Sequence, residues 1–215
     1  MRENTVTAQK PKTLFVTFEG IDGCGKTTQA VLAYQYLTAR GIRAKLLREP
    51  GATATAERIR EVLLDQKLSI TPVTELLLYE AARSELTSRE IRPLLASGYT
   101  VLCDRFYDST TAYQGFGRKL DIRMVRSLNR LAVGDLKPDV TFLLDLDLKT
   151  ARSRWAGRPD RLESQSRAFF FRVRSGFLEL ARKERRRIKV IDAARSVHEV
   201  FENIRTILDR RIDKE

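Results

Sequence analysis

The sequence predicts an α/β protein built on a five-stranded parallel sheet with helices on both faces. Short apolar runs alternate with longer helical patterns along the 215 residues. The run at 140–146 is largely apolar, which is typical of a strand buried on both faces. A glycine-rich loop joins the first apolar run to the first helical pattern. Strands that alternate with helices indicate a parallel sheet, because each connection must cross back over the sheet.

Boundary residues support the individual elements. The expected strands are 14–19, 43–48, 100–103, 140–146 and 189–191. The expected helices are 26–40, 55–66, 72–97, 108–113, 121–133, 148–154, 163–185 and 197–211. Gly41 and Gly98 follow the first and third helices, where glycine commonly ends a helix. Thr71 suits the cap of the third helix and Pro72 its first position, and we expect Pro93 to bend its last part.

We expect one domain at 13–215, with a movable lid at 154–162 and a flexible N-terminal arm at 1–12. The chain has no apolar run long enough to cross a membrane, and the arm lacks the hydrophobic stretch of a secretory signal. Its two cysteines, Cys24 and Cys103, fit no metal or disulfide spacing. We therefore expect a cytoplasmic protein without a membrane partner.

The formal net charge is +12, which indicates polyanionic partners. Nucleic acid is one interpretation, because Lys and Arg neutralise a phosphate backbone. However, the sequence has no helix-turn-helix pattern and no aromatic-interleaved basic stretch. Several arginines instead lie beside the loops at strand ends. We therefore favour small phosphorylated substrates and expect no specific nucleic-acid partner.

The most specific motif is a phosphate-binding loop of the form G-x-x-x-x-G-K-[ST]. The loop and the start of its helix comprise Gly20, Ile21, Asp22, Gly23, Cys24, Gly25, Lys26, Thr27 and Thr28. Backbone N–H groups of such a loop surround the phosphates of ATP, and the helix dipole favours the same negative charge. We expect Lys26 to reach the β- and γ-phosphates and Thr27 to hold Mg²⁺. The Cys24 thiol would have a lowered pKa if its sulfur faced the helix N-terminus.

Charged residues also end the second and third expected strands. The second strand ends in Arg48 and Glu49, and the third ends in Asp104 and Arg105. The carboxyl ends of parallel strands meet at one edge of the sheet, so these groups should face the phosphate loop. Phosphoryl transfer requires such cations to neutralise phosphate oxygens, and carboxylates to order Mg²⁺. Ala52 follows Gly51 in the next turn, and we expect it to avoid left-handed backbone angles.

These motifs resemble the thymidylate kinases over nearly the whole chain. The matching segments are FEGIDGCGKTT at 18–28, REPG at 48–51, YEAAR at 79–83, DRF at 104–106 and STTAYQG at 109–115. The last segment, together with Asp104-Arg105, is far more specific than the phosphate loop alone. The resemblance implies a P-loop NTPase-type sheet, Mg-ATP as donor, dTMP as acceptor, dTDP and ADP as products, and a homodimer.

The resemblance also assigns roles. Tyr79 matches the aromatic that stacks on thymine, Arg83 an arginine that hydrogen-bonds the base, and Gln114 the amide that reads its edge. The other implied dTMP-binding residues are Asp22, Arg48, Glu49, Pro50, Arg105, Ser109, Thr110 and Tyr113. Lys26, Asp104 and Arg105 are expected to be catalytic, and Asp104 to lie near Mg²⁺ with Thr27.

The lid is expected to supply a further catalytic arginine. Family members with glycine at the position of Gly23 provide this arginine from the lid instead of the phosphate loop. Arg154, Arg158 and Arg161 are available, and Arg154 and Arg158 are the leading candidates. The lid spacing differs in detail from that of the bacterial members, so the choice among these arginines stays open.

Other functions remain open at this point. A related pyrimidine nucleotide or deoxynucleoside kinase would share the loop, but Arg48 and Arg105 favour an acceptor that already carries a phosphate. A P-loop ATPase acting on nucleic acid would leave 109–115 without a purpose. A homologue that only binds nucleotide is disfavoured by the intact Lys26, Thr27 and Asp104.

Overall fold

The five predicted strands form one parallel sheet. The computed structural model describes residues 13–154 and 160–213. The strands are β1 (Phe15–Glu19), β2 (Ala44–Arg48), β3 (Thr100–Asp104), β4 (Val140–Asp145) and β5 (Ile188–Asp192). They lie in the order β2-β3-β1-β4-β5, and every neighbouring pair is parallel. The α/β class predicted from the sequence is therefore confirmed, and β1 lies at the centre with the phosphate loop at its carboxyl end.

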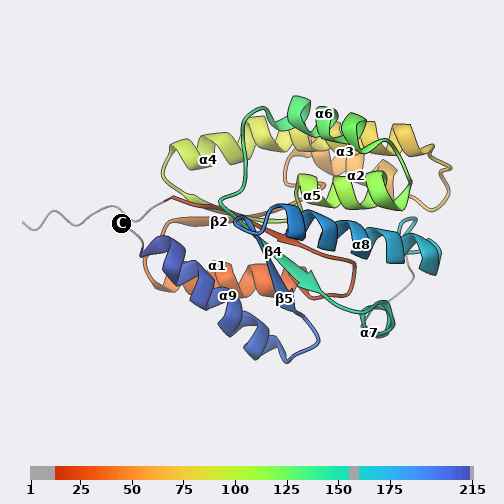
Figure 1. Ribbon diagram of the computed structural model, residues 1–215. Helices are drawn as coiled ribbons and strands as arrows, with labels where there is room; N and C mark the ends of the chain where they lie inside the picture. The colour runs from red at the N-terminus through yellow and green to blue at the C-terminus, as the bar shows by residue number, and fades with distance from the viewer. Residues whose placement is uncertain (1–12, 155–159, 214–215) are drawn as a thin grey trace, which may run out of the picture.

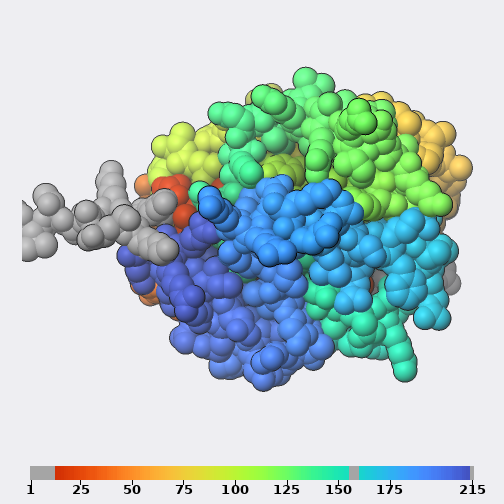
Figure 2. All heavy atoms as spheres, in the orientation of Figure 1, coloured from red at the N-terminus to blue at the C-terminus, as the bar shows by residue number. Residues whose placement is uncertain are grey.

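Helices cover both faces of the sheet (Figure 1). The α-helices are α1 (Lys26–Ala39), α2 (Ala54–Leu64), α3 (Pro72–Leu86), α4 (Arg92–Ala96), α5 (Tyr107–Thr110), α6 (Ile122–Val133), α7 (Leu148–Ser153), α8 (Arg167–Lys183) and α9 (Val197–Ile212). Two π-helical segments, η1 (Thr87–Ile91) and η2 (Thr111–Gly117), interrupt them. α1 and α9 lie on one face, and α3 to α6 lie on the other. In the space-filling view, α6 in green and α8 and α9 in blue form much of the visible surface (Figure 2).

The side chains of β1 alternate between the two faces. Phe15 packs against Phe106 at a ring-centroid distance of 4.9 Å in the smaller hydrophobic cluster. Val16 and Phe18 are fully buried in the larger cluster, which includes Leu37 of α1. This period of two follows from strand geometry. Because its apolar side chains pack on both faces, β1 is held between two layers of helices. A rigid central strand fixes the position of the loop that follows it.

Three predicted helices differ from the observed ones, and the one expected at 108–113 is divided into α5 and η2. The helix expected at 72–97 is divided by η1, and Pro93 lies in the first turn of α4, where its missing N–H is tolerated. The helix expected from residue 163 begins at Arg167, because the Ser166 side chain accepts a hydrogen bond from Phe169 N and caps it there. No helix in the described ranges is long and apolar enough to span a bilayer.

The turn after β2 contradicts the expectation for Ala52, whose φ is 66°. Its N–H donates to Glu57 Oε1 at 2.8 Å, which holds the turn in this conformation. A residue with a Cβ in the left-handed conformation costs roughly 1–2 kcal/mol, and replacing it by glycine removes this cost. Glycine also gives the unfolded chain more conformational entropy, which offsets about half of the stability gained.

We therefore expect Ala52→Gly to raise the free energy of unfolding by about 0.5–1 kcal/mol. The melting temperature in thermal unfolding measures this change in stability. Ala54→Gly, at the ordinary helical start of α2, is the control and should lower the melting temperature. A lower melting temperature for Ala52→Gly would contradict this assignment of strain.

Candidate active site

A large cavity lies at the carboxyl edge of the sheet. It measures about 1030 Å³ and is lined by the phosphate loop and by the ends of β2 and β3. Asp104 at the end of β3 pairs in register with Arg48 of β2 and with Phe18 of β1. The predicted convergence of Arg48, Asp104 and Arg105 on the loop is therefore observed.

The phosphate loop has the backbone geometry that its glycines allow. Gly20, Gly23 and Gly25 have φ values of 139°, 80° and 94°. A Cβ on Gly20 would lie 2.5 Å from Leu144 O, so this position excludes any other residue. Ile21, Asp22 and Gly23 form the turn, and Gly25 leads into α1. The loop is thereby shaped to present N–H groups to an anion.

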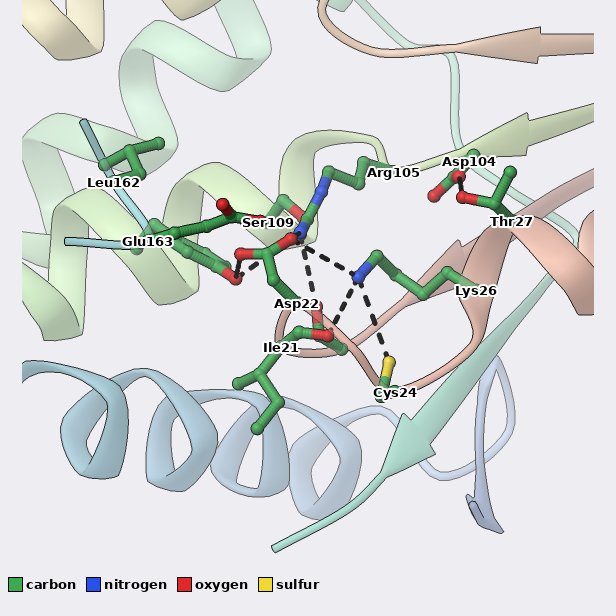
Figure 3. A network of polar contacts seen from close by, with 12 residues as sticks. Ile21, Asp22, Cys24, Lys26, Thr27, Asp104, Arg105, Ser109, Leu162 and Glu163 are labelled. Carbon is green, nitrogen blue, oxygen red and sulfur yellow. Dashed lines mark hydrogen bonds and ion pairs between the residues drawn. The ribbon is translucent and has the colours of Figure 1, made fainter. Parts of the chain in front are cut away.

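Lys26 lies buried beside this loop. Its Nζ donates to Ile21 O at 2.9 Å and lies 3.8 Å from Asp22 Oδ1 and 3.8 Å from Cys24 Sγ (Figure 3). These contacts hold the ammonium group at the cavity, where a phosphate would meet it. Cys24 is itself buried, and burial raises the pKa of its thiol. The lowered thiol pKa considered from the sequence is therefore wrong.

Thr27 and Asp104 form a pair of oxygen donors at the start of α1. Thr27 Oγ1 donates to Asp104 Oδ2 at 2.5 Å. Asp104 Oδ1 is buried, and no group in the described part of the chain donates to it. An unpartnered carboxylate oxygen beside a threonine hydroxyl is the donor set that Mg²⁺ prefers.

Arg105 is held in place by contacts of both its backbone and its side chain. Its backbone has a φ of 72°, and its N–H donates to Phe18 O at 2.9 Å. Its guanidinium donates to Gly20 O at 3.1 Å, to Ser109 Oγ at 3.0 Å, and to the carboxylate of Asp22. Tyr113 completes the cluster, and its hydroxyl donates to Asp22 Oδ2 at 2.9 Å.

The charge state of Asp22 follows from this cluster. Burial alone would raise the pKa of Asp22, but Arg105 and Lys26 hold it below its ordinary value. Asp22 is therefore ionised at neutral pH and restrains both cations at the mouth of the loop.

A second, smaller cavity adjoins the first one. Asp22, Glu49, Arg60 and Arg105 line both cavities. The second cavity is lined in addition by Pro50, Leu64, Tyr79, Arg83, Ser109, Thr110, Tyr113, Gln114, Asp160 and Leu162. Most residues predicted to bind dTMP are thus brought together, and Arg105 lies between them and the phosphate loop.

Arg83 lines this second cavity and is almost fully buried, with 2% exposure. Its Nε donates to Glu49 Oε2 and its Nη2 to Thr110 Oγ1, both at 2.8 Å. Its Nη1 donates to Glu80 Oε1 at 2.9 Å and to Asn129 Oδ1 at 3.1 Å. These four bonds within the described chain leave one N–H, on Nη2, for a ligand. Burial raises the pKa of Glu49 to about 7, and Arg83 opposes that shift.

Two arginines of the β2–α2 region line other cavities than the sequence predicted or were not predicted at all. Arg48 lines only the larger cavity, and its Nη2 donates to both oxygens of Glu57 at 2.9 Å. Arg60, which the sequence analysis missed, lines both cavities and donates to Pro50 O at 3.0 Å. The sequence does indicate that Arg60 faces inward, because it shares a helix face with the buried Ala56 and Leu63.

The structure describes part of the predicted lid. Arg154 lines the larger cavity, and its Nη1 donates to Ala193 O at 3.2 Å. Arg158 lies outside the described residues, as do residues 1–12 of the predicted arm. Arg161 points elsewhere, since it donates to Leu63 O at 2.8 Å and to Glu75 Oε2 at 2.6 Å. Of the described lid arginines, Arg154 is the one at the larger cavity.

Known proteins share both this sequence and this fold. A family model described as thymidylate kinase matches residues 18–204. The thymidylate kinase of Gloeobacter violaceus is 48% identical over 200 residues, covering 91% of this chain and 94% of that protein. That of Geobacter sulfurreducens is 46% identical over 209 residues, covering 93% and 98%. A crystal structure of thymidylate kinase from Ehrlichia chaffeensis has a TM-score of 0.75 at 36% identity, covering 92% of this chain and 99% of that one. The chain belongs to the thymidylate kinase family.

Proposed function

We propose that the protein transfers the γ-phosphoryl group of ATP to the 5′-phosphate of dTMP, giving dTDP and ADP. One observation carries the proposal: Arg105 lines both cavities, between the Lys26 loop and the pocket of Tyr79. ATP occupies the larger cavity with its phosphates on the loop, and dTMP occupies the smaller one with its phosphate toward Arg105. The two phosphate chains then meet end to end, as an in-line transfer requires.

Positioning and electrostatics supply the catalysis in this proposal. Lys26 neutralises the transferred phosphoryl group, and Arg105 and Arg60 neutralise the acceptor phosphate. Asp22 holds Lys26 and Arg105 in place before substrate arrives, so little reorganisation is needed at the moment of transfer. No covalent intermediate with the enzyme is required.

Mg²⁺ fits the donor set formed by Thr27 and Asp104. The unpartnered Asp104 Oδ1 supports the assignment, and phosphate oxygens and waters would complete the shell. When bound, the ion would neutralise the charge that develops on the phosphate oxygens. Chelation by EDTA should accordingly abolish turnover, and added Mg²⁺ should restore it.

A coupled ADP-release assay with a panel of acceptors tests the function. We expect turnover with dTMP and little with thymidine, because Arg105 would then lack a phosphate to bind. Faster turnover with thymidine than with dTMP would instead support a deoxynucleoside kinase. ADP release that is independent of acceptor would support an ATPase.

Tyr79→Ala should raise the KM for dTMP roughly tenfold or more, because base–aromatic stacking contributes about 1–3 kcal/mol. The KM for ATP should change little, since Tyr79 lines only the smaller cavity. Tyr79→Phe is the matched control and should retain the wild-type KM. Equal effects of Tyr79→Ala on both substrates would remove Tyr79 from the base pocket.

Arg154→Ala or Arg158→Ala should lower kcat by about 10²-fold with little change in the KM for dTMP. The reason is that a lid arginine opposes charge that develops in the transition state. Steady-state kinetics of both variants measure the effect, with Lys149→Ala at an exposed position of α7 as the control. If both arginine variants keep the full rate, the lid assignment fails.

We also propose that the protein is a homodimer formed through α2, α3 and α6. Large apolar side chains are exposed on these helices and on the α2–α3 connection: Val62, Leu68, Val73, Leu77, Met124 and Leu131. α3 packs against both α2 and α6, and the three helices lie on the same side of the sheet (Figure 1). Light scattering should give twice the 24.7 kDa of one chain, and Leu77→Glu should give the monomer. A monomeric wild type would contradict the proposal.

A further inference from the structure

A buried carboxylate lies behind the second cavity. Glu75 of α3, one turn before Tyr79, has no exposed surface. Its oxygens accept hydrogen bonds from Gln114 Nε2 at 2.8 Å, Arg118 Nε at 3.0 Å, Arg118 Nη2 at 2.9 Å and Arg161 Nη1 at 2.6 Å. A buried charge is tolerated when it is paired and hydrogen-bonded in this way. Two arginines therefore hold the carboxylate against Gln114.

Glu75 acts as a hydrogen-bond acceptor only. Burial alone would raise the pKa of Glu75, but Arg118, Gln114 and Arg161 together hold it below its ordinary value. At neutral pH the side chain is ionised and has no proton to donate.

An acceptor-only neighbour determines which end of the Gln114 amide faces it. The amide atom 2.8 Å from Glu75 must be the NH₂ nitrogen, because two oxygen acceptors would repel. Gln114 lines the second cavity, and no described residue donates to its Oε1. The amide oxygen is therefore left for a ligand in that cavity.

A fixed amide distinguishes the two common pyrimidines. Thymine carries a proton on N3 and an acceptor at O4, whereas cytosine has an acceptor at N3 and an amino group at C4. A carbonyl oxygen opposite N3 accepts from thymine but meets a lone pair of cytosine. An amide that could rotate by 180° would place its NH₂ group there and accommodate cytosine as well.

We propose that Glu75 is a positioning residue that fixes the orientation of the Gln114 amide and thereby makes the base pocket select thymine over cytosine. The inference rests on the proposed function, because it takes the cavity beside Tyr79 as the acceptor's base pocket. Glu75 acts through Gln114 and touches no substrate atom itself.

Glu75→Gln tests this role, because the new side chain has the same shape but can also donate a hydrogen bond. Both orientations of the Gln114 amide then become available. We expect the ratio of kcat/KM for dTMP to that for dCMP to fall about tenfold, a difference of about 1.4 kcal/mol, because a mispaired buried polar group disfavours cytosine only while the Gln114 amide is fixed. Loss of structure alone would lower both values together and leave the ratio unchanged.

Two further variants complete the experiment. Glu184→Gln removes a carboxylate between Arg187 and Lys137, remote from Gln114, and should keep the wild-type ratio. Glu75→Asp keeps the negative charge that pairs with Arg118 and Arg161. Its side chain is shorter by one methylene group, so the carboxylate lies farther from Gln114. It should fold and show the same change in ratio.

The outcomes separate the two proposals. A wild-type protein without dTMP kinase activity would overturn the proposed function. An active wild type, together with folded Glu75→Gln and Glu75→Asp variants that keep its dTMP/dCMP ratio, would overturn the role of Glu75 alone.

Discussion

Lys26→Ala is expected to lower kcat by about 10³-fold or more. The lysine is the cation of the phosphate loop, and its Nζ is held at the cavity by Ile21 O and Asp22. Without it, the charge that develops on the transferred phosphoryl group has no counter-charge from the loop. Single-turnover kinetics with saturating ATP and dTMP measure the chemical step directly.

The control for this variant is Lys45→Ala on β2, an exposed lysine of the same sheet. It should keep kcat close to that of the wild type. ATP binding by Lys26→Ala should weaken less than kcat falls, because the backbone of the loop remains. A variant that retains near-normal kcat would show that the loop does not hold the reacting phosphate.

Arg105→Gln is expected to lower kcat/KM for dTMP by about 10³-fold, because it removes a charge-assisted contact to the acceptor phosphate. The KM for ATP should change far less, since Lys26 and the loop are intact. Steady-state kinetics with each substrate varied in turn will separate the two effects.

Arg105→Lys is the matched comparison. It keeps the charge but loses the planar group that reaches Gly20 O, Ser109 Oγ and Asp22 together. We expect activity between that of Arg105→Gln and the wild type. Both variants must first be shown to fold, because Asp22 loses a partner. Two results would exclude Arg105 as the ligand of the acceptor phosphate. One is an equal loss of kcat/KM for ATP and for dTMP, and the other is a loss of kcat/KM for dTMP smaller than tenfold in folded Arg105→Gln.

Local patterns made the fold predictable. Each strand was visible as a short apolar run, and the phosphate loop marked the junction between β1 and α1. The strand order β2-β3-β1-β4-β5 was not visible, because it depends on contacts between residues far apart in the chain. The π-helical segments η1 and η2 were also missed, since they preserve the helical pattern and differ only in hydrogen bonding.

The site was predictable where its residues lie in motifs. Lys26, Thr27, Asp104 and Arg105 adjoin the ends of β1 and β3, and the structure brings them to one cavity.

The pairing of arginines with carboxylates was not predictable in this way. Arg161 contacts Glu75, and Arg83 contacts Glu49, through side chains that meet only after the helices pack. From the sequence, Arg154 and Arg158 were preferred over Arg161 without knowledge of these contacts, and the structure shows that Arg161 instead contacts Glu75.

Two nucleotides are expected to bind with their phosphate chains facing each other across Arg105. A dinucleotide in which adenosine and thymidine are joined through five phosphates, 5′ to 5′, tests this arrangement most directly. We expect this compound to compete with both ATP and dTMP in steady-state inhibition. Competition with only one of the two substrates would show that the cavities do not meet as described.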